Sequence, residues 1–158
     1  SIYMKNYYIP SGPQTALQAS LNYRSKKFWF ATATFNYMAR NWIDFSPLAR
    51  TREGVDMLQP GTAEFEGAIA QQKLPSFYTV DLFGGKSFKV NKYIKKASSN
   101  TFLLLNIGLT NVLNNKKINL YGFENLRAAG ERDNPDWFAP RYAYALGIQY
   151  FLNLSLRF

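Results

Sequence analysis

The residues of this chain that could take part in catalysis are two pairs of carboxylates. Glu64 and Glu66 lie two positions apart in one polar segment, and Asp133 and Asp136 lie three positions apart in another. Such pairs can act as the acid and the nucleophile of glycoside cleavage, or can bind Ca²⁺ through their oxygens. The simpler alternative, which we favour, is that all four are solvated charges in loops.

Other reactive groups are scarce, because the 158 residues include no histidine and no cysteine. The chain therefore lacks the commonest general base and the commonest metal ligand, and it can form neither a disulfide framework nor a thiolate metal site. The segment GFENLRAAG does not have the pattern of a phosphate-binding loop. We predict no catalytic residue, no cofactor and no metal site, and hence a protein that is not an enzyme.

The segment DNPDWFAP, residues 133–140, offers a different kind of site. It combines hydrogen-bonding groups with two aromatic rings, which can stack on a ligand; packing against neighbouring loops is the alternative. The candidate ligand-facing residues are Asn134, Asp136, Trp137 and Phe138.

The charge and hydropathy of the chain exclude two classes of partner or fold. The net charge is +9, but the basic residues form short clusters between apolar segments, so we predict no nucleic-acid binding. No run of about 18 apolar residues is present, which excludes a transmembrane helix. The opening SIYMKNYYIP does not resemble a signal peptide and lacks an initial Met, so we expect these residues to be part of a longer protein.

The elements that must position the loops are long strands. In residues 141–158, RYAYALGIQYFLNLSLRF, every even position is aromatic or aliphatic, and only Phe151 is large and apolar among the odd ones. Such alternation predicts a strand, because successive side chains point to opposite faces. A strand of this length exceeds the roughly 5–6 residues of a typical globular strand and fits the about 9–11 residues of a membrane-spanning one.

The same alternation predicts four more strands, at residues 15–24, 28–44, 77–90 and 101–113. Gly84 and Gly85 would allow a bend or bulge in the third. Short basic turns, 25–27 and 91–100, alternate with long connections, 45–76 and 114–140, the second of which has room for an extra hairpin or helix. This alternation is typical of an antiparallel transmembrane β-barrel, of which five strands could form only a part. A soluble β-sandwich or lectin is the alternative fold.

Several motifs along residues 12–158 resemble one family. GPQTALQASLNYR and the aromatic hairpin after it, the SPLART segment, YTVDLFGGK, LTNVLNNK and the closing strand are similar to the C-terminal end of TonB-dependent outer-membrane receptors of the Bacteroidetes (SusC-like) type. Thr110 departs from the family pattern, which usually has Asn there, and Leu48-Ala49 precede the Arg-Thr pair.

The resemblance implies that residues 1–158 are the C-terminal part, about five strands, of one 22-stranded barrel domain in the outer membrane of a Gram-negative bacterium. The N-terminal plug and the segment that contacts TonB would lie outside them. The implied function is import of a nutrient, with glycan, peptide and siderophore all open; the alternative is a non-transporting barrel such as an adhesin, a secretion-associated barrel or a porin. The implied partners are the lipid bilayer, lipopolysaccharide, the barrel assembly machinery, TonB and a SusD-like surface lipoprotein.

The last strand carries a second predicted role. Apolar residues at alternate positions with a terminal aromatic form the assembly signal of outer-membrane barrels, and the residues that fit it are Tyr150, Leu152, Leu154, Leu156 and Phe158; an interfacial anchor is the alternative role of Phe158. A periplasmic C-terminus would place 45–76 and 114–140 outside the cell. The distribution of charge also distinguishes the two ends of the predicted strands. Nine of the ten acidic residues lie in or near the long connections, and nine basic residues lie at or near the short turns.

Overall fold

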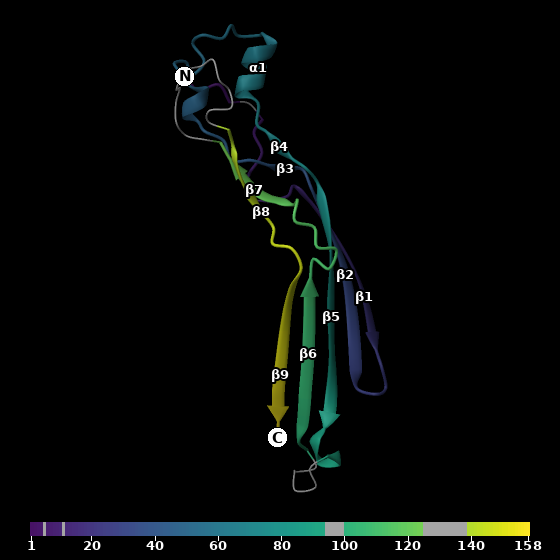
Figure 1. The fold of residues 1–158 in the computed structure, drawn as a ribbon. Coiled ribbons are helices and arrows are strands. Elements are labelled where there is room, and N and C mark those ends of the chain that lie inside the picture. The colour runs from purple at the N-terminus through teal and green to yellow at the C-terminus, as the bar shows by residue number, and fades with distance from the viewer. Residues whose placement is uncertain (5, 11, 94–99, 125–138) are drawn as a thin grey trace. The chain divides into compact units, whose positions relative to one another are not determined.

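The computed structural model describes residues 1–4, 6–10, 12–93, 100–124 and 139–158 (Figure 1). The chain divides into two compact units, which we call the loop unit and the sheet unit. The loop unit comprises Ser1–Thr15, Met38–Ser76 and Lys117–Ala145, and the sheet unit comprises Ala16–Tyr37, Phe77–Lys116 and Leu146–Phe158.

The sheet unit is built on one five-stranded sheet in the order β1-β2-β5-β6-β9. β5 pairs antiparallel with β6, and β6 pairs antiparallel with β9. This confirms the prediction of an all-β, antiparallel fold. The strands are β1 (Thr15–Arg24), β2 (Trp29–Ala39), β5 (Phe77–Lys89), β6 (Phe102–Thr110) and β9 (Gln149–Arg157).

One end of this sheet, which we call the short-turn end, holds the turn between β1 and β2, the end of β5, the start of β6 and the C-terminus (Figure 1). β1 turns into β2 through a tight reversal in which the Ser25 backbone N–H donates to the Trp29 carbonyl at 2.8 Å. β5 is followed by the 3₁₀ turn η2 (Val90–Lys92). The two long connections therefore leave the strands at the opposite end, as the alternation of loop lengths predicts.

The prediction of one strand over 141–158 is wrong, because residues 145–148 are not in a strand and separate β8 (Arg141–Tyr144) from β9. β8 instead pairs with β7 (Asn119–Phe123) in a separate two-stranded sheet. Side chains replace strand partners at the interruption: Asn111 donates to the Leu146 carbonyl at 3.1 Å, and the Ile148 N–H donates to Asn114 at 3.1 Å. β7 lies in the second long connection, whereas its partner β8 lies in the predicted last strand.

The predicted strand 28–44 is also interrupted. β2 ends at Ala39, Arg40 adopts a left-handed φ of 55°, and β3 (Asn41–Trp42) then pairs with β4 (Lys73–Leu74). A positive φ turns the backbone out of an extended conformation, which ends the strand. Gly84 and Gly85 produce no bulge in the pairing of β5 with β6, because this register is continuous from Leu82 to Lys89.

The loop unit has a small hydrophobic core of the usual kind. Its helices are η1 (Leu48–Arg50) and α1 (Ala63–Ile69), the latter capped by the Thr62 hydroxyl, which accepts from the Phe65 N–H. The buried hydrophobic side chains are Ile43, Val55, Phe65, Leu74 and Ile118. The first long connection, residues 45–76, is thus a folded segment. Among the described residues, no helix has the length and apolar character needed to cross a bilayer.

Candidate membrane-facing surface

The register of the sheet unit assigns each side chain to one of two faces. Directly paired residues of neighbouring strands share a face. Leu105 of β6 pairs with Lys86 and Leu154, whereas Asn106 pairs with Gly85 and Asn153. The structure therefore confirms the alternation predicted for these strands: Leu105 lies on one face of the sheet and Asn106 on the other.

One face, which we call the apolar face, is almost entirely hydrophobic and lies open. On the outer strands its large side chains are exposed: Leu21 is 79% exposed, Leu152 67% and Leu154 63%. On the inner strand β6, Leu103, Leu105 and Leu109 are half-buried. No described hydrophobic side chain of the sheet unit is buried. The residues of this face include Ala19, Leu21, Ala31, Ala33, Leu82, Gly84, Lys86, Leu105, Ile107, Leu109, Leu152, Leu154 and Leu156.

The aromatic residues of the apolar face lie near the ends of the strands, and aliphatic or small residues lie between them. Those at the short-turn end are Tyr23, Trp29, Phe88 and Phe158. Those at the other end are Phe35, Tyr37, Tyr78 and Tyr150. Barrels of the outer membrane carry this arrangement, an apolar band flanked by aromatic girdles at both interfaces.

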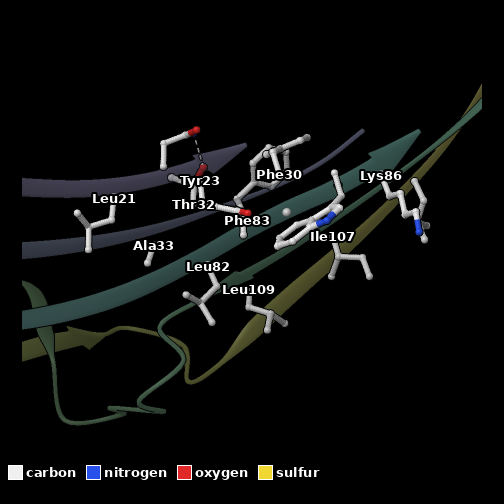
Figure 2. Close-up of a pocket in the computed structure, with 16 residues that line it drawn as sticks. Leu21, Tyr23, Phe30, Thr32, Ala33, Leu82, Phe83, Lys86, Ile107 and Leu109 are labelled. Carbon is white, nitrogen blue, oxygen red and sulfur yellow. Dashed lines mark hydrogen bonds between the residues drawn. The ribbon is translucent and has the colours of Figure 1, made fainter. Parts of the chain in front are cut away.

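A shallow hollow of about 870 Å³ marks the middle of the apolar face (Figure 2). Its floor is formed by the small residues Ala31, Ala33 and Gly84 of β2 and β5. In Figure 2, Leu21, Ala33, Leu82 and Leu109 succeed one another across four strands, and Lys86 lies toward one end. The hollow exists because two adjacent strands have little or no side chain there.

The opposite face, the polar face, is joined across strands by side-chain hydrogen bonds. Gln18 donates to Asn36 at 2.9 Å, and Asn36 donates to the Asp81 carboxylate at 2.8 Å. The second oxygen of Asp81 accepts the backbone N–H of Asn111 at 2.9 Å. Ser20–Thr34 and Asn22–Thr32 form further pairs between β1 and β2. These bonds satisfy polar groups within the sheet, which favours one register over a slipped one.

Three rings cross the polar face above two glycines, Gly85 under Phe30 and Gly108 under Phe151. The ring centroids of Phe30 and Phe83 are 5.3 Å apart, and those of Phe83 and Phe151 are 5.9 Å apart. Phe151 lies directly over Gly108: a Cβ there would be 1.9 Å from Cε1 of the ring. Gly108 is therefore required for the ring of β9 to reach across β6 to β5.

The five predicted assembly-signal residues occupy one line at the edge of the sheet. Tyr150, Leu152, Leu154 and Leu156 project from the apolar face of β9, and Phe158 follows the strand with 94% of its surface exposed. Their accessibility fits recognition by another protein or contact with lipid. The candidate ligand-facing residues Asn134, Asp136, Trp137 and Phe138 lie outside the described residues.

Of the two carboxylate pairs, only Glu64 and Glu66 lie in the described part of the chain. Glu64 and Glu66 lie in the first turn of α1, where acidic side chains favour the positive end of the helix dipole. Asp133 and Asp136 lie outside the described residues. No group of three or more carboxylates that could hold a metal ion occurs among the residues described.

Arg50 makes more hydrogen bonds than any other charged side chain among the described residues, although no role was predicted for it from the sequence. Its guanidinium is 99% buried and forms a two-pronged ion pair with Glu124. It also donates to Tyr7 and to the carbonyls of Ser46 and Ala70, at 3.0 Å for each carbonyl. Both long connections and the N-terminal segment therefore meet at one side chain.

The environment of Arg50 keeps it charged. Burial alone would lower the pKa of Arg50, but the hydrogen bond and negative charge of Glu124, with a smaller contribution from Tyr7, raise this pKa above its ordinary value. The rings of Tyr7 and Phe45 face the guanidinium at 5.2 and 5.8 Å. The sequence feature that could have pointed to Arg50 is the SPLART motif, which contains it. Nothing in or near that motif indicates that Glu124 is its partner.

Comparisons of the chain with models of known protein families, with curated proteins and with solved structures found no match.

Proposed function

We propose that this chain is the C-terminal part of an outer-membrane β-barrel, of the TonB-dependent receptor type, that imports a nutrient. The observation that carries the membrane part of the proposal is the uncovered apolar face. A domain in water covers the hydrophobic face of a sheet with a second layer. In the sheet unit no described hydrophobic side chain is buried, so the apolar face needs a cover from outside.

Lipid is the cover that fits best. The five strands contain 9 to 13 residues, which matches the about 9–11 residues needed for a tilted strand to cross a bilayer. The aromatic residues at both strand ends fit the two interfaces of a membrane. A second protein layer, as in a sandwich, gives no reason for aromatic residues to gather at both ends.

The edges of the sheet support a larger assembly. β1 and β9 are the outer strands of the order, so each has one backbone edge without a neighbour in the sheet. Lipid cannot satisfy the N–H and C=O groups of an open edge. In the proposed barrel, strands from the rest of the protein pair with both.

Transport and its energy source rest on the resemblance of the motifs. The folded long connections would be the external loops, and the Arg50–Glu124 pair would hold them together around an entry path for the ligand. The ligand could be a glycan, a peptide or a siderophore. The alternative function is a non-transporting barrel of the adhesin, secretion-associated or porin kind.

Expression of the full-length protein in a Gram-negative host tests the location and orientation. We expect it in the outer-membrane fraction, with electrophoretic mobility that changes on boiling; recovery as a soluble protein would overturn the proposal. In a background without other cysteines, Glu64→Cys should react with an impermeant thiol reagent on intact cells, and Lys26→Cys only after the outer membrane is opened. The reverse labelling would overturn the orientation.

Uptake separates the two functions. An importer of this type accumulates its ligand only in cells with functional TonB, and its reading frame encodes a plug and a TonB-contacting segment upstream. A porin lets solutes pass in liposomes with no energy source. If solutes pass through the protein in liposomes without an energy source, and the upstream sequence predicts only strands, the protein is a porin and not an importer.

Deletion of Phe158 tests the role of the terminus in assembly. If the alternating residues of β9 are recognised by the barrel assembly machinery, the deletion should lower the amount of assembled barrel more than the stability of barrel already assembled. Normal assembly of the deletion variant would leave Phe158 as an interfacial anchor.

A further inference from the structure

The hollow around Gly84 is the most distinct feature of the apolar face that the proposed function does not use. Ala31, Ala33 and Gly84 form a floor between the longer side chains of β1 and β6, such as Leu21 and Ile107 (Figure 2). The neighbouring strands run along its length, so the depression is open lengthwise and lined by hydrocarbon. A flexible chain of methylene groups has the shape and the polarity to fill it.

The hollow has a cation at one end. Lys86 is the only charged side chain that the described strands place on the apolar face, and it lies on the side toward the short-turn end. Its ammonium is 5.0 Å from the centroid of the Phe88 ring, the next residue of this face in the direction of that end. No described carboxylate forms an ion pair with it. The charge is therefore available to an anion at the boundary of the apolar band.

We propose that this hollow binds an anionic glycerophospholipid, with one acyl chain over Gly84 and the phosphate against Lys86. The proposal rests on the proposed membrane location. Long cationic side chains lie along apolar surface and hold their charge at the head-group level. Trp29 and Tyr23, which also line the hollow, would flank the glycerol region where amphipathic rings are favoured.

The charge argument is tested with a pair of lysines on opposite faces. Lys89 lies three residues after Lys86 in the same strand, but it pairs with Phe102 on the polar face. Full-length protein in detergent would be mixed with phosphatidylglycerol or phosphatidylcholine, and retained lipids counted by native mass spectrometry. We expect wild type and Lys89→Gln to prefer phosphatidylglycerol about fivefold, the factor equivalent to roughly 1 kcal/mol per cation near a membrane surface. Lys86→Gln should lose the preference.

Two outcomes of that experiment overturn the charge argument. If Lys86→Gln retains the preference, Lys86 does not bind the phosphate. If both variants lose it equally, the preference reflects the general positive charge of the short-turn end instead of a site.

The shape argument is tested with a pair of alanines on the apolar face. Ala33→Leu would fill the hollow, whereas Ala19→Leu adds the same atoms to β1 outside its lining. We expect Ala33→Leu to reduce retained lipid of either head group several-fold and Ala19→Leu to leave it unchanged. Equal retention by both variants would overturn the hollow as the binding site. Loss of a dimer in Ala33→Leu would also overturn it, because the occupant would then be a second copy of the protein.

These results separate failure of the site from failure of the proposed function. A protein that inserts into the outer membrane but retains lipid equally in all variants contradicts the lipid site alone. A protein found in the soluble fraction, with no lipid retained by any variant, contradicts the membrane location itself.

Discussion

The two units of this chain distribute their side chains in opposite ways. The buried hydrophobic side chains of the described residues all belong to the loop unit, as in any small soluble domain. Among the described residues of the sheet unit, those that are buried are Thr101, Gly108 and Asn111, and none of them is a large hydrophobic residue. The loop unit contains its own stabilising interior, whereas the stability of the sheet unit depends on what covers its apolar face. Mutations should therefore act by different mechanisms in the two.

The largest effect is expected where the loop unit buries a charge. Arg50→Ala leaves the Glu124 carboxylate without its partner and the carbonyls of Ser46 and Ala70 without their donor. We therefore expect a loss of about 3–5 kcal/mol in the local stability of this unit. Hydrogen exchange of residues 45–76 measures it directly. Arg52→Ala, at an exposed neighbouring arginine, is the control and should change exchange by less than about 0.5 kcal/mol. Equal exchange in the two variants would show that the buried pair does not hold the loop unit together.

The next effect tests whether the apolar face contacts lipid. Leu105→Arg adds a second cation beside Lys86 on that face. It should lower the free energy of unfolding in lipid vesicles by up to about 2–4 kcal/mol, the cost that applies at the bilayer midplane. Asn106→Arg, on the polar face, should cost clearly less. Urea unfolding followed by tryptophan fluorescence gives both values. Similar losses at 105 and 106 would mean that the two faces of the sheet have similar surroundings.

These two sites also differ in how far the sequence could predict them. The faces of the sheet follow from alternation within single strands, which is local information, and β1 has the predicted bounds, 15–24. The Arg50–Glu124 pair joins residues 74 positions apart, and the interruption before β9 depends on Asn114 hydrogen bonding 34 positions away. Alternation continues through Tyr144 and Leu146 without a sign of that interruption. Local patterns predicted the strands and their faces, but not the contacts that end them.

The change Gly108→Ala on the polar face should alter stability in the opposite direction to the same change at an ordinary strand glycine. Replacing a strand glycine with alanine normally favours the strand, because glycine loses more backbone entropy on folding. At position 108 the new Cβ would collide with the Phe151 ring, so we expect Gly108→Ala to cost about 1–3 kcal/mol. In a Phe151→Ala background the same change should be neutral or stabilising. A double-mutant cycle with no coupling would show that the ring does not occupy this place.

The smallest effect returns to the loop unit, at an exposed contact that contrasts with the buried pair. The Tyr121 hydroxyl donates to the Asp44 carboxylate at 3.0 Å, and burial followed by the hydrogen bond and charge of Asp44 raises the pKa of Tyr121. Because the pKa is higher in the folded than in the unfolded protein, the contribution is complete below about pH 10 and is lost as the pH rises through the raised pKa. Tyrosine-selective NMR titration should find the pKa of Tyr121 closer to the ordinary value in Asp44→Asn. At neutral pH, Tyr121→Phe should destabilise by no more than about 1 kcal/mol, well below the cost of Arg50→Ala, because both partners can exchange this bond for water. A cost as large as that of Arg50→Ala would mean that the exposed contact, and not only the buried pair, holds the loop unit together.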